Sequence, residues 1–184
     1  MSSIDSVIRS IVEGKLEASG STLITIDGPA GAGKTTLAEI LKSELRQREI
    51  SVEIIHMDDL YDGWDNALGP KLGLALEDIA KQSQGKEIIH PIYNWAEKKF
   101  TRIKSIPTPQ VLILEGVGAG REEIREKTSL SIWVDIEPSL GVHRAISRDG
   151  EVIAPFMETW SQKQAEYFAE HHTRENASFT IVME

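Results

Sequence analysis

The sequence of 184 residues contains no cysteine. This absence excludes disulfide bonds, a thiol nucleophile and zinc sites built from thiolates, and it is compatible with the reducing cytoplasm in which we expect the protein to work. Aromatic residues are also scarce, at 6% of the chain. No apolar run approaches the roughly 20 residues of a membrane-spanning helix, so we expect no membrane partner.

Basic residues are few relative to acidic ones, with 20 Lys and Arg against 29 Asp and Glu and a net charge of −9. This balance argues against a nucleic-acid partner, because such proteins present a basic surface. An acidic protein that binds phosphates must instead concentrate its positive charge where the phosphates lie. The length suits one domain spanning residues 1–184.

Short apolar runs alternate along the chain with segments of helical periodicity, which predicts an α/β fold around a parallel sheet. We expect an open five-stranded parallel sheet flanked by helices, preceded by an extra amphipathic helix at the N-terminus. The predicted strands are 22–26, 51–56, 111–114, 130–134 and 179–183, and the predicted helices after the first are 34–48, 72–84, 139–148 and 159–174. The segment 58–109, which contains the helix predicted at 72–84, is rich in Gly, Pro, Trp and Tyr and is expected to be less regular. Long irregular segments in compact domains are usually functional.

Residues 28–35, GPAGAGKT, match the pattern G-x-x-x-x-G-K-[ST] of a phosphate-binding loop, the Walker A motif or P-loop. Backbone N–H groups must converge on phosphate oxygens there, and the following helix points its positive end at the anion. We expect Lys34 to bridge the β- and γ-phosphates of ATP and the Thr35 hydroxyl to bind Mg²⁺. The residues expected to contact ATP are Gly28, Ala30, Gly31, Ala32, Gly33, Lys34, Thr35 and Thr36.

Other motifs distinguish among the classes of P-loop protein. The N-K-x-D segment of a GTPase and the L-S-G-G-Q signature of a transport ATPase are both missing from the sequence. A small-molecule kinase needs a carboxylate near the acceptor hydroxyl, a pocket for the acceptor and mobile cations. The segment HMDDLYDGW directly follows a predicted strand, so Asp58 is expected to face the phosphates and Tyr61 to line the acceptor pocket. Asp58 would accept the acceptor's proton or help to position Mg²⁺.

Two further segments supply charged candidates. In VLILEGVGAG a buried strand ends in Glu115, where a P-loop protein often has an acidic ligand to the metal or its water. In HRAISRDG, Arg144 and Arg148 are four residues apart and therefore on one face of a helix. We expect residues 144–155 to form a short lid whose two arginines assist phosphoryl transfer.

The segment HPIYNWAEKKF offers two aromatic residues with polar neighbours. Tyr93 and Trp95 alternate, which on a strand places both on one side, and aromatic planes beside polar groups suit a ring-shaped acceptor such as a nucleobase. Core packing explains each residue alone about equally well. The other tryptophans, Trp64, Trp133 and Trp160, are expected in the core or at its rim.

With these segments in hand, the chain resembles the uridine kinase family of P-loop nucleoside kinases between about residues 22 and 150. IDGPAGAGKTT resembles the family's phosphate loop, MDDLY its Asp-Ser-Phe-Tyr segment and PIYNW its Pro-x-Tyr-Asp-Phe segment. ILEGV resembles its strand-end Glu-Gly, and VDIEPSLGVHRAISRDG its Val-Asp strand end and lid. The resemblance implies that Asp58 is the base, that Tyr61 and Tyr93 contact a nucleoside, and that Arg144 and Arg148 are lid arginines.

Departures from the family pattern leave the acceptor open. Asn94 replaces the family's Asp, Lys98 stands where the family has a base-reading His, and the lid is shorter. The main expectation is ATP-dependent phosphorylation of a nucleoside hydroxyl, with Lys98 and Arg102 beside the acceptor. The alternatives are a nucleoside monophosphate, for which Arg102 and Arg121 would bind the phosphate, a non-nucleoside alcohol, or a regulatory ATPase that acts on a partner. Neither ATP over GTP nor the oligomeric state follows from the sequence.

Overall fold

The computed structural model describes residues 3–14 and 20–183, and its centre is a five-stranded sheet. The strands are β1 (Thr22–Asp27), β2 (Val52–His56), β5 (Val111–Glu115), β6 (Leu130–Asp135) and β7 (Phe179–Val182). They lie in the order β2-β5-β1-β6-β7, and every neighbouring pair is parallel. The predicted open parallel sheet with five strands is therefore confirmed.

The sheet is buried on both faces because its strands alternate side chains between two apolar clusters. In β1, Leu23 belongs to the cluster on one face, whereas Ile24 and Ile26 belong to the cluster on the other. This alternation explains why the sequence shows continuous apolar runs here and no polar–apolar alternation. Two layers of helices are therefore needed to cover the sheet.

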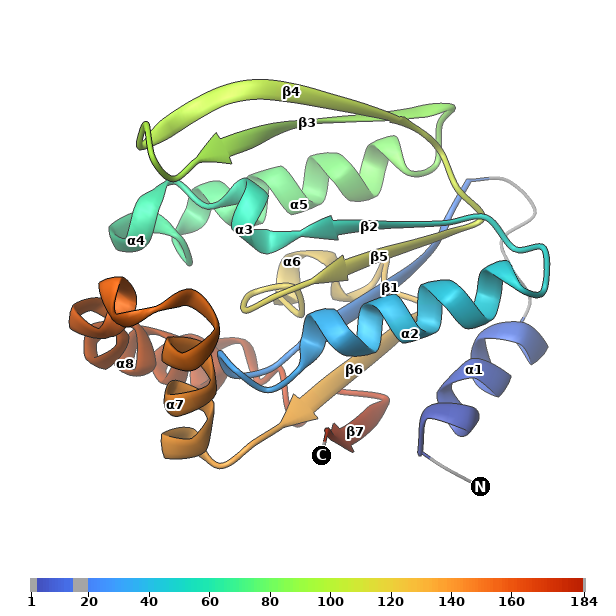
Figure 1. Cartoon of the computed structure of the whole chain (residues 1–184). Helices are drawn as coiled ribbons and strands as arrows, with labels where there is room; N and C mark the ends of the chain where they lie inside the picture. The colour runs from blue at the N-terminus through green and yellow to red at the C-terminus, as the bar shows by residue number, and fades with distance from the viewer. Residues whose placement is uncertain (1–2, 15–19, 184) are drawn as a thin grey trace.

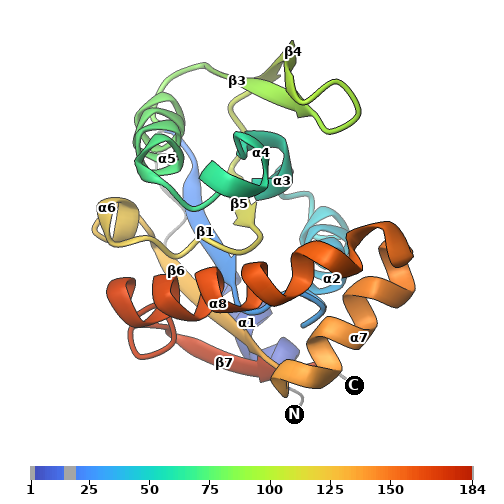
Figure 2. The same cartoon turned by 90° about the vertical axis from the view of Figure 1, so that its left-hand side faces the viewer.

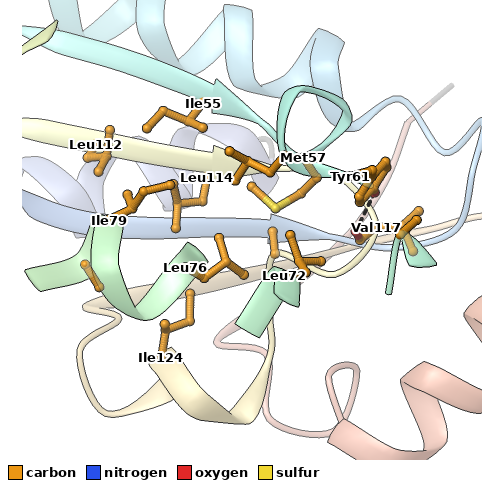
Figure 3. Packing of buried hydrophobic residues seen from close by; sticks show 14 of the residues in the cluster. Ile55, Met57, Tyr61, Leu72, Leu76, Ile79, Leu112, Leu114, Val117 and Ile124 are labelled. Carbon is orange, nitrogen blue, oxygen red and sulfur yellow. Dashed lines mark hydrogen bonds between the residues drawn. The ribbon is translucent and has the colours of Figure 1, made fainter. Parts of the chain in front are cut away.

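Helices cover the two faces unequally, as Figures 1 and 2 show. One face is covered by α1 (Ser3–Glu13) and α2 (Lys34–Arg46), whose buried residues join the cluster of Ile24 and Ile26. The other is covered by α5 (Pro70–Gln82), α6 (Glu122–Arg125) and α8 (Ala154–His171). The expected additional helix at the N-terminus is α1. Figure 3 shows the second cluster, in which Leu72, Leu76 and Ile79 of α5 pack against Leu112 and Leu114 of β5.

The segment expected to be less regular is mostly ordered secondary structure. After β2 come two single-turn helices, α3 (Met57–Leu60) and α4 (Gly63–Asn66), and then α5. A long antiparallel hairpin follows, formed by β3 (Glu87–Asn94) and β4 (Lys99–Pro107). Figure 1 shows this hairpin lying over α5, apart from the central sheet. The helix predicted at 72–84 is confirmed as α5, whereas the expectation that the rest of the segment is less regular is wrong because of the hairpin.

The chain after β6 first forms helices that lie at the same end of the molecule as α3 and α4 (Figure 1). Helix α7 (Pro138–Asp149) is followed by the 3₁₀ turn η1 (Glu151–Ile153), and α8 then runs back across the sheet (Figure 2). Helix α8 begins at Ala154, earlier than the predicted residue 159, because Pro155 occupies its first turn, where proline is favoured. Within the described ranges no helix is long and apolar enough to cross a membrane.

Candidate active site

A cleft of about 910 Å³ lies beyond the C-terminal ends of β1, β2 and β5. Its walls come from the loop after β1, from α3 and α4, from the tip of the β3–β4 hairpin, and from the region of α7, η1 and α8. Ligands of open parallel sheets bind at this edge, because the loops that follow the strands converge there. The cleft therefore stands where the sequence motifs are expected to meet.

The loop between β1 and α2 can form only because it carries glycines at two crowded positions. Gly28 and Gly31 have φ of 142° and 76°. A Cβ atom would lie 2.2 Å from the carbonyl oxygen of Val134 at Gly28, and 2.1 Å from that of Gly141 at Gly31. The loop residues that face the cleft are Ala30, Gly31, Gly33, Lys34, Thr35 and Thr36. Gly28 and Ala32, also expected to contact ATP, are buried residues of the same loop and do not line the cleft.

Lys34 is held against the loop that it follows. Its Nζ atom donates hydrogen bonds of 2.8 Å to the Gly28 carbonyl and 2.7 Å to the Pro29 carbonyl. Burial lowers the pKa of Lys34, and the negative charges of Asp27, Glu115 and Asp58 oppose that shift. The ammonium group is therefore close to the cleft and is surrounded by partners that favour its charged form.

Asp27 was not among the predicted site residues, although it is the last residue of β1 and is only 3% exposed. Its carboxylate accepts hydrogen bonds from the backbone N–H groups of Gly28, at 2.7 Å, Gly118, at 3.1 Å, and Gly120, at 2.9 Å. Burial raises the pKa of Asp27 to about 6. Asp27 thus ties the phosphate loop to the glycine turn after β5. The argument applied to Glu115, that a charge at the end of a core strand needs a partner, would have identified it.

Thr35 and Glu115 meet at the floor of the cleft. The Thr35 hydroxyl donates a 3.1 Å hydrogen bond to Glu115 Oε1, and the Nδ1 atom of His56 contacts the same oxygen. That bond to Glu115 raises the pKa of His56 and so favours the imidazolium form. His56, at the end of β2, was not predicted as a site residue.

The pair formed by Thr35 and Glu115 suits a magnesium ion. Mg²⁺ takes hard oxygen ligands, usually one or two from the protein and the rest from phosphates and water. No group of three or more His, Asp or Glu side chains placed to hold a metal occurs in the described part of the chain. A site here would therefore draw on this hydroxyl and carboxylate together with a bound nucleotide.

Asp58 stands on the opposite wall, in the first turn after β2. It is exposed to the open cleft, but the surrounding walls partly remove its carboxyl group from bulk water. This desolvation, followed by the negative charge of Glu115, raises the pKa of Asp58. A carboxyl group with a raised pKa is a better general base near neutral pH than an ordinary aspartate.

The two arginines of α7 have different surroundings. Arg148 lines the cleft and is paired with Asp149 by hydrogen bonds of 2.7 and 2.6 Å. Arg144 does not line it; its Nη1 atom donates a 3.3 Å hydrogen bond to the carbonyl of Met183, just after β7. A helical turn advances 5.4 Å along the axis, so the earlier arginine meets the sheet edge and only the later one reaches the cleft. The expectation that both face the phosphates is not met for Arg144.

Aromatic side chains form the acceptor side of the cleft. Tyr61, Trp64, Trp95 and Trp160 all line it, together with Phe156. Trp64 and Trp160 were expected in the core or at its rim, and they pack at the rim of the core where they also line the cleft, whereas Trp133 packs against Phe168 away from the cleft. These side chains come from separate segments of the chain, and this explains why no local pattern revealed them.

Tyr93 is placed differently from the expectation. Strand β3 ends at Asn94, so Trp95 begins the hairpin turn and the two aromatics do not alternate along one strand. Tyr93 is buried, and its ring meets that of Trp95 edge-on at a centroid distance of 5.1 Å. It thus supports the cleft wall from behind and does not form part of it.

The predicted cations of the acceptor site also lie elsewhere. Lys98 is at the exposed hairpin turn with φ of 54°, and Arg102 is exposed on β4; neither lines the cleft. Arg121 is buried, where it donates to Glu123 at 2.8 Å and to the carbonyl of Leu68 at 2.9 Å. Arg102 is away from the cleft because only the tip of the hairpin approaches it, and within that tip Trp95 and Ala96 line the cleft while Lys98 does not.

Comparisons with known proteins agree with this geometry. The sequence model of the phosphoribulokinase/uridine kinase family matches residues 23–169. A structure described as a possible uridine kinase from Bacillus stearothermophilus aligns with a TM-score of 0.72 at 19% identity, over 97% of each chain.

Two further solved structures extend the comparison. One described provisionally as a fructose transport system kinase from Silicibacter sp. TM1040 aligns with a TM-score of 0.63 at 17% identity, over 98% of each chain. A D-glycerate 3-kinase from Cryptococcus neoformans var. grubii aligns with a TM-score of 0.57 at 11% identity, over 90% of this chain and 84% of that one. At these identities the likeness establishes the fold, and the acceptor has to be argued from the cleft.

Proposed function

The chain belongs to the phosphoribulokinase/uridine kinase family, and we propose that this P-loop kinase transfers the γ-phosphoryl group of ATP to a hydroxyl group of a nucleoside. The observation that carries the proposal is that Lys34 and Asp58 line one cleft. Their charges interact, and aromatic side chains surround the acceptor side. A volume of about 910 Å³ is at the upper end of the ~300–1,000 Å³ range of ligand sites, which suits two substrates side by side.

The residues of the cleft divide the chemistry between them. The acceptor hydroxyl would attack the γ-phosphorus, forming one O–P bond while the bond from that phosphorus to the β–γ bridging oxygen breaks and ADP leaves. Asp58 would take the proton of the hydroxyl. Lys34 and Arg148 would stabilise the charge on the moving group.

Magnesium held by Thr35 and Glu115 would neutralise phosphate charge and orient the phosphates. Loop N–H groups and the start of α2 would bind the phosphate oxygens. One of these donors is already in use, because the N–H of Ala30 bonds to Gln164 Oε1 at 3.1 Å. The nucleotide would compete with Gln164 for that group.

The proposal is tested by incubating the purified chain with Mg²⁺ and ATP and with each common nucleoside in turn. ADP formation and the mass of the product are measured. We expect a phosphorylated nucleoside, and we expect Asp58→Asn to lower kcat by about 10²–10⁴-fold while leaving ATP binding intact. Asp59→Asn is the matched control, because Asp59 is the next carboxylate on α3 and does not line the cleft.

Two results would contradict the proposal. Absence of Mg²⁺-ATP binding would remove the kinase assignment for this cleft. Hydrolysis of ATP without transfer to any acceptor would instead favour a nucleotide-dependent regulatory protein. Equal activity of the Asp58 and Asp59 variants would remove only the assignment of the base.

A further inference from the structure

Five aromatic side chains surround the part of the cleft beyond Asp58, and we call them the aromatic box: Tyr61, Trp64, Trp95, Phe156 and Trp160. Their rings touch one another at centroid distances between 5.4 and 6.4 Å. Three of the four tryptophans of the whole sequence belong to the box. In a chain with only 6% aromatic residues, this concentration at one site points to recognition of a flat or apolar group.

Two of the four polar side-chain atoms of the box are already bound to the protein. The Tyr61 hydroxyl donates a 2.6 Å hydrogen bond to the carbonyl of Val117, the dashed line in Figure 3. Trp95 Nε1 donates a 3.1 Å hydrogen bond to the carbonyl of Asp58. These side chains therefore present ring surface to an acceptor and have no free polar atom to distinguish one base edge from another.

The polar side chains of the neighbouring hairpin tip are also committed. The Oδ1 atom of Asn94 accepts hydrogen bonds of 3.0 Å from the N–H groups of Ala96 and Glu97, and its Nδ2 atom donates to the Glu97 carboxylate at 2.9 Å. Asn94 therefore shapes the turn that presents Trp95. Lys98, further along the turn, does not line the cleft.

Positive charge is confined to the nucleotide side of the cleft. Within residues 3–14 and 20–183, Lys34 and Arg148 are the only basic residues that line it, and both are needed for the phosphates of ATP. Arg102 and Arg121, the candidates for an acceptor phosphate, are exposed on β4 and bound to Glu123, respectively. An acceptor with its own phosphate or carboxylate would bring a charge next to Asp58 with no further cation to neutralise it.

Two donors of the box remain. The indole N–H groups of Trp64 and Trp160 have no hydrogen-bond partner in the described ranges of the chain. An indole N–H is a donor only, so it can bind a carbonyl oxygen, a ring nitrogen or an ether oxygen. Such atoms occur in every nucleobase, so these donors favour a heteroaromatic ring without selecting one base.

Resting on the kinase function proposed above, we propose that the acceptor site selects an uncharged alcohol that carries a flat aromatic ring. The ring is recognised by stacking in the aromatic box, and the edges of the base are not used to choose among nucleobases. Acceptors that bear a phosphate or a carboxylate are rejected. The enzyme is thus a broad kinase for ring-bearing alcohols and is not specific for one pyrimidine nucleoside.

The first experiment compares kcat/KM for uridine, cytidine, adenosine and guanosine with that for D-fructose, D-glycerate and uridine 5′-monophosphate. We expect the four nucleosides to agree within about tenfold, the range that one stacking contact supplies. The two anionic compounds are expected to be at least about 100-fold poorer, because an unpaired buried charge costs several times as much as a lost stacking contact. D-Fructose, which has no flat ring to stack, is expected to be poorer by about tenfold or more. Preference for one base by more than 100-fold, or for fructose or glycerate, would overturn the inference and leave the kinase function standing.

The second experiment changes the box itself. Trp64→Leu is expected to raise KM for nucleosides about tenfold with a much smaller effect on kcat, and Trp64→Phe is expected to restore most of the loss. Phe100→Leu is the matched control, since Phe100 is a half-exposed aromatic of the hairpin that does not line the cleft. Equal KM values for Trp64→Leu and the control would contradict the inference.

Binding without ATP separates this inference from the proposed function. Tryptophan fluorescence of a Trp133→Phe background reports only the three tryptophans of the box. We expect saturable quenching by nucleosides and none by D-glycerate, whether or not turnover occurs. Absence of quenching by any nucleoside would overturn the aromatic acceptor, whereas quenching without turnover would overturn only the kinase reaction.

Discussion

The hydroxyl of Thr35 donates a 3.1 Å hydrogen bond to a carboxylate oxygen of Glu115, and so joins the first turn of α2 to the end of β5. The two residues are distant in the sequence, and their contact forms only when β1 and β5 pair in the observed register. It brings a hydroxyl and a carboxylate, two hard oxygen ligands, to the mouth of the phosphate loop. The first prediction follows from this contact.

Replacement of Thr35 by valine keeps the shape of the side chain and removes the hydroxyl. We expect Thr35→Val to weaken binding of Mg²⁺-ATP by roughly 10–100-fold, while binding of ATP in the presence of a chelator changes little. Calorimetric titration with and without Mg²⁺ measures both affinities. Thr35→Ser keeps the hydroxyl and should retain most of the affinity. An equal loss with and without the metal would show that Thr35 acts only through packing.

The pH dependence of turnover should report on Asp58. A general base must be ionised, and the pKa of Asp58 is raised, so kcat/KM should fall with decreasing pH at a higher pH than the usual aspartate value of about 3.9. The measurement is a pH profile of kcat/KM for the wild type and for Asp58→Asn, in which this acidic limb should disappear.

A second group can titrate in the same range and needs its own control. The pKa of His56 is raised by its hydrogen bond to Glu115. His56→Gln removes that titration and should leave the Asp58 limb in place. An acidic limb that persists in Asp58→Asn and vanishes in His56→Gln would transfer the assignment to the histidine.

Asp27 should make the protein less stable as the pH rises. Its pKa is about 6 in the folded protein against 3.8 for an ordinary aspartate side chain, so between these pH values the folded state binds one more proton than the unfolded state. The stabilisation that comes from this extra proton is fully present below about pH 4 and is lost once the pH exceeds about 6. At 1.36 kcal/mol per pKa unit, the loss in the free energy of unfolding is roughly 3 kcal/mol.

The variant Asp27→Asn isolates this contribution. Asparagine cannot accept a hydrogen bond through its Nδ2 atom, so we expect the variant to have a lower free energy of unfolding than the wild type. Because only the wild type loses stability as Asp27 ionises, this deficit should shrink by roughly 3 kcal/mol between pH 4 and pH 7. Urea unfolding at several pH values measures the difference. A deficit that is independent of pH would show that Asp27 has an ordinary pKa in the folded protein.

Glycine at position 31 should be essential for the shape of the phosphate loop. A Cβ atom there would lie 2.1 Å from the Gly141 carbonyl, and φ is positive at 76°, so Gly31→Ala must displace the loop or α7. We expect a loss of more than about 2 kcal/mol in the free energy of unfolding, together with weaker ATP binding. Gly150 also has positive φ, 90°, but a Cβ atom there would meet nothing within 4 Å. Gly150→Ala should therefore cost only about 1 kcal/mol, and equal effects of the two substitutions would contradict the steric argument.

The sequence predicted the elements whose signals are local. The phosphate loop follows from eight consecutive residues, and the five strands of the sheet follow from short apolar runs between helical patterns. The hairpin was not predicted because Pro91 interrupts the strand-like residues of β3, and a proline within a strand argues against a central strand of a sheet. In the structure β3 pairs only with β4, so an interruption by proline is tolerated.

The remaining errors come from contacts between distant segments. The four-residue spacing predicted that Arg144 faces the same way as Arg148. Its hydrogen-bond partner, the carbonyl of Met183 just after β7, is almost forty residues away in the sequence, so no local pattern revealed it. Trp64 and Trp160 gave no signal because the aromatic box is assembled from separate segments. Asp27 could have been found, since an acid at the end of a buried strand requires partners, and the glycine turn after β5 supplies them.

Phe156 of α8 stacks on Trp64 of α4 with an interplanar angle of 1° and a centroid distance of 5.4 Å. This contact joins the two walls of the cleft. Separating one aromatic pair forfeits about 0.5–1.5 kcal/mol beyond the area buried, no more than about three times the thermal energy. Thermal motion can therefore break this stack often, and the stack alone would not hold the two walls closed during exchange of reactant and product.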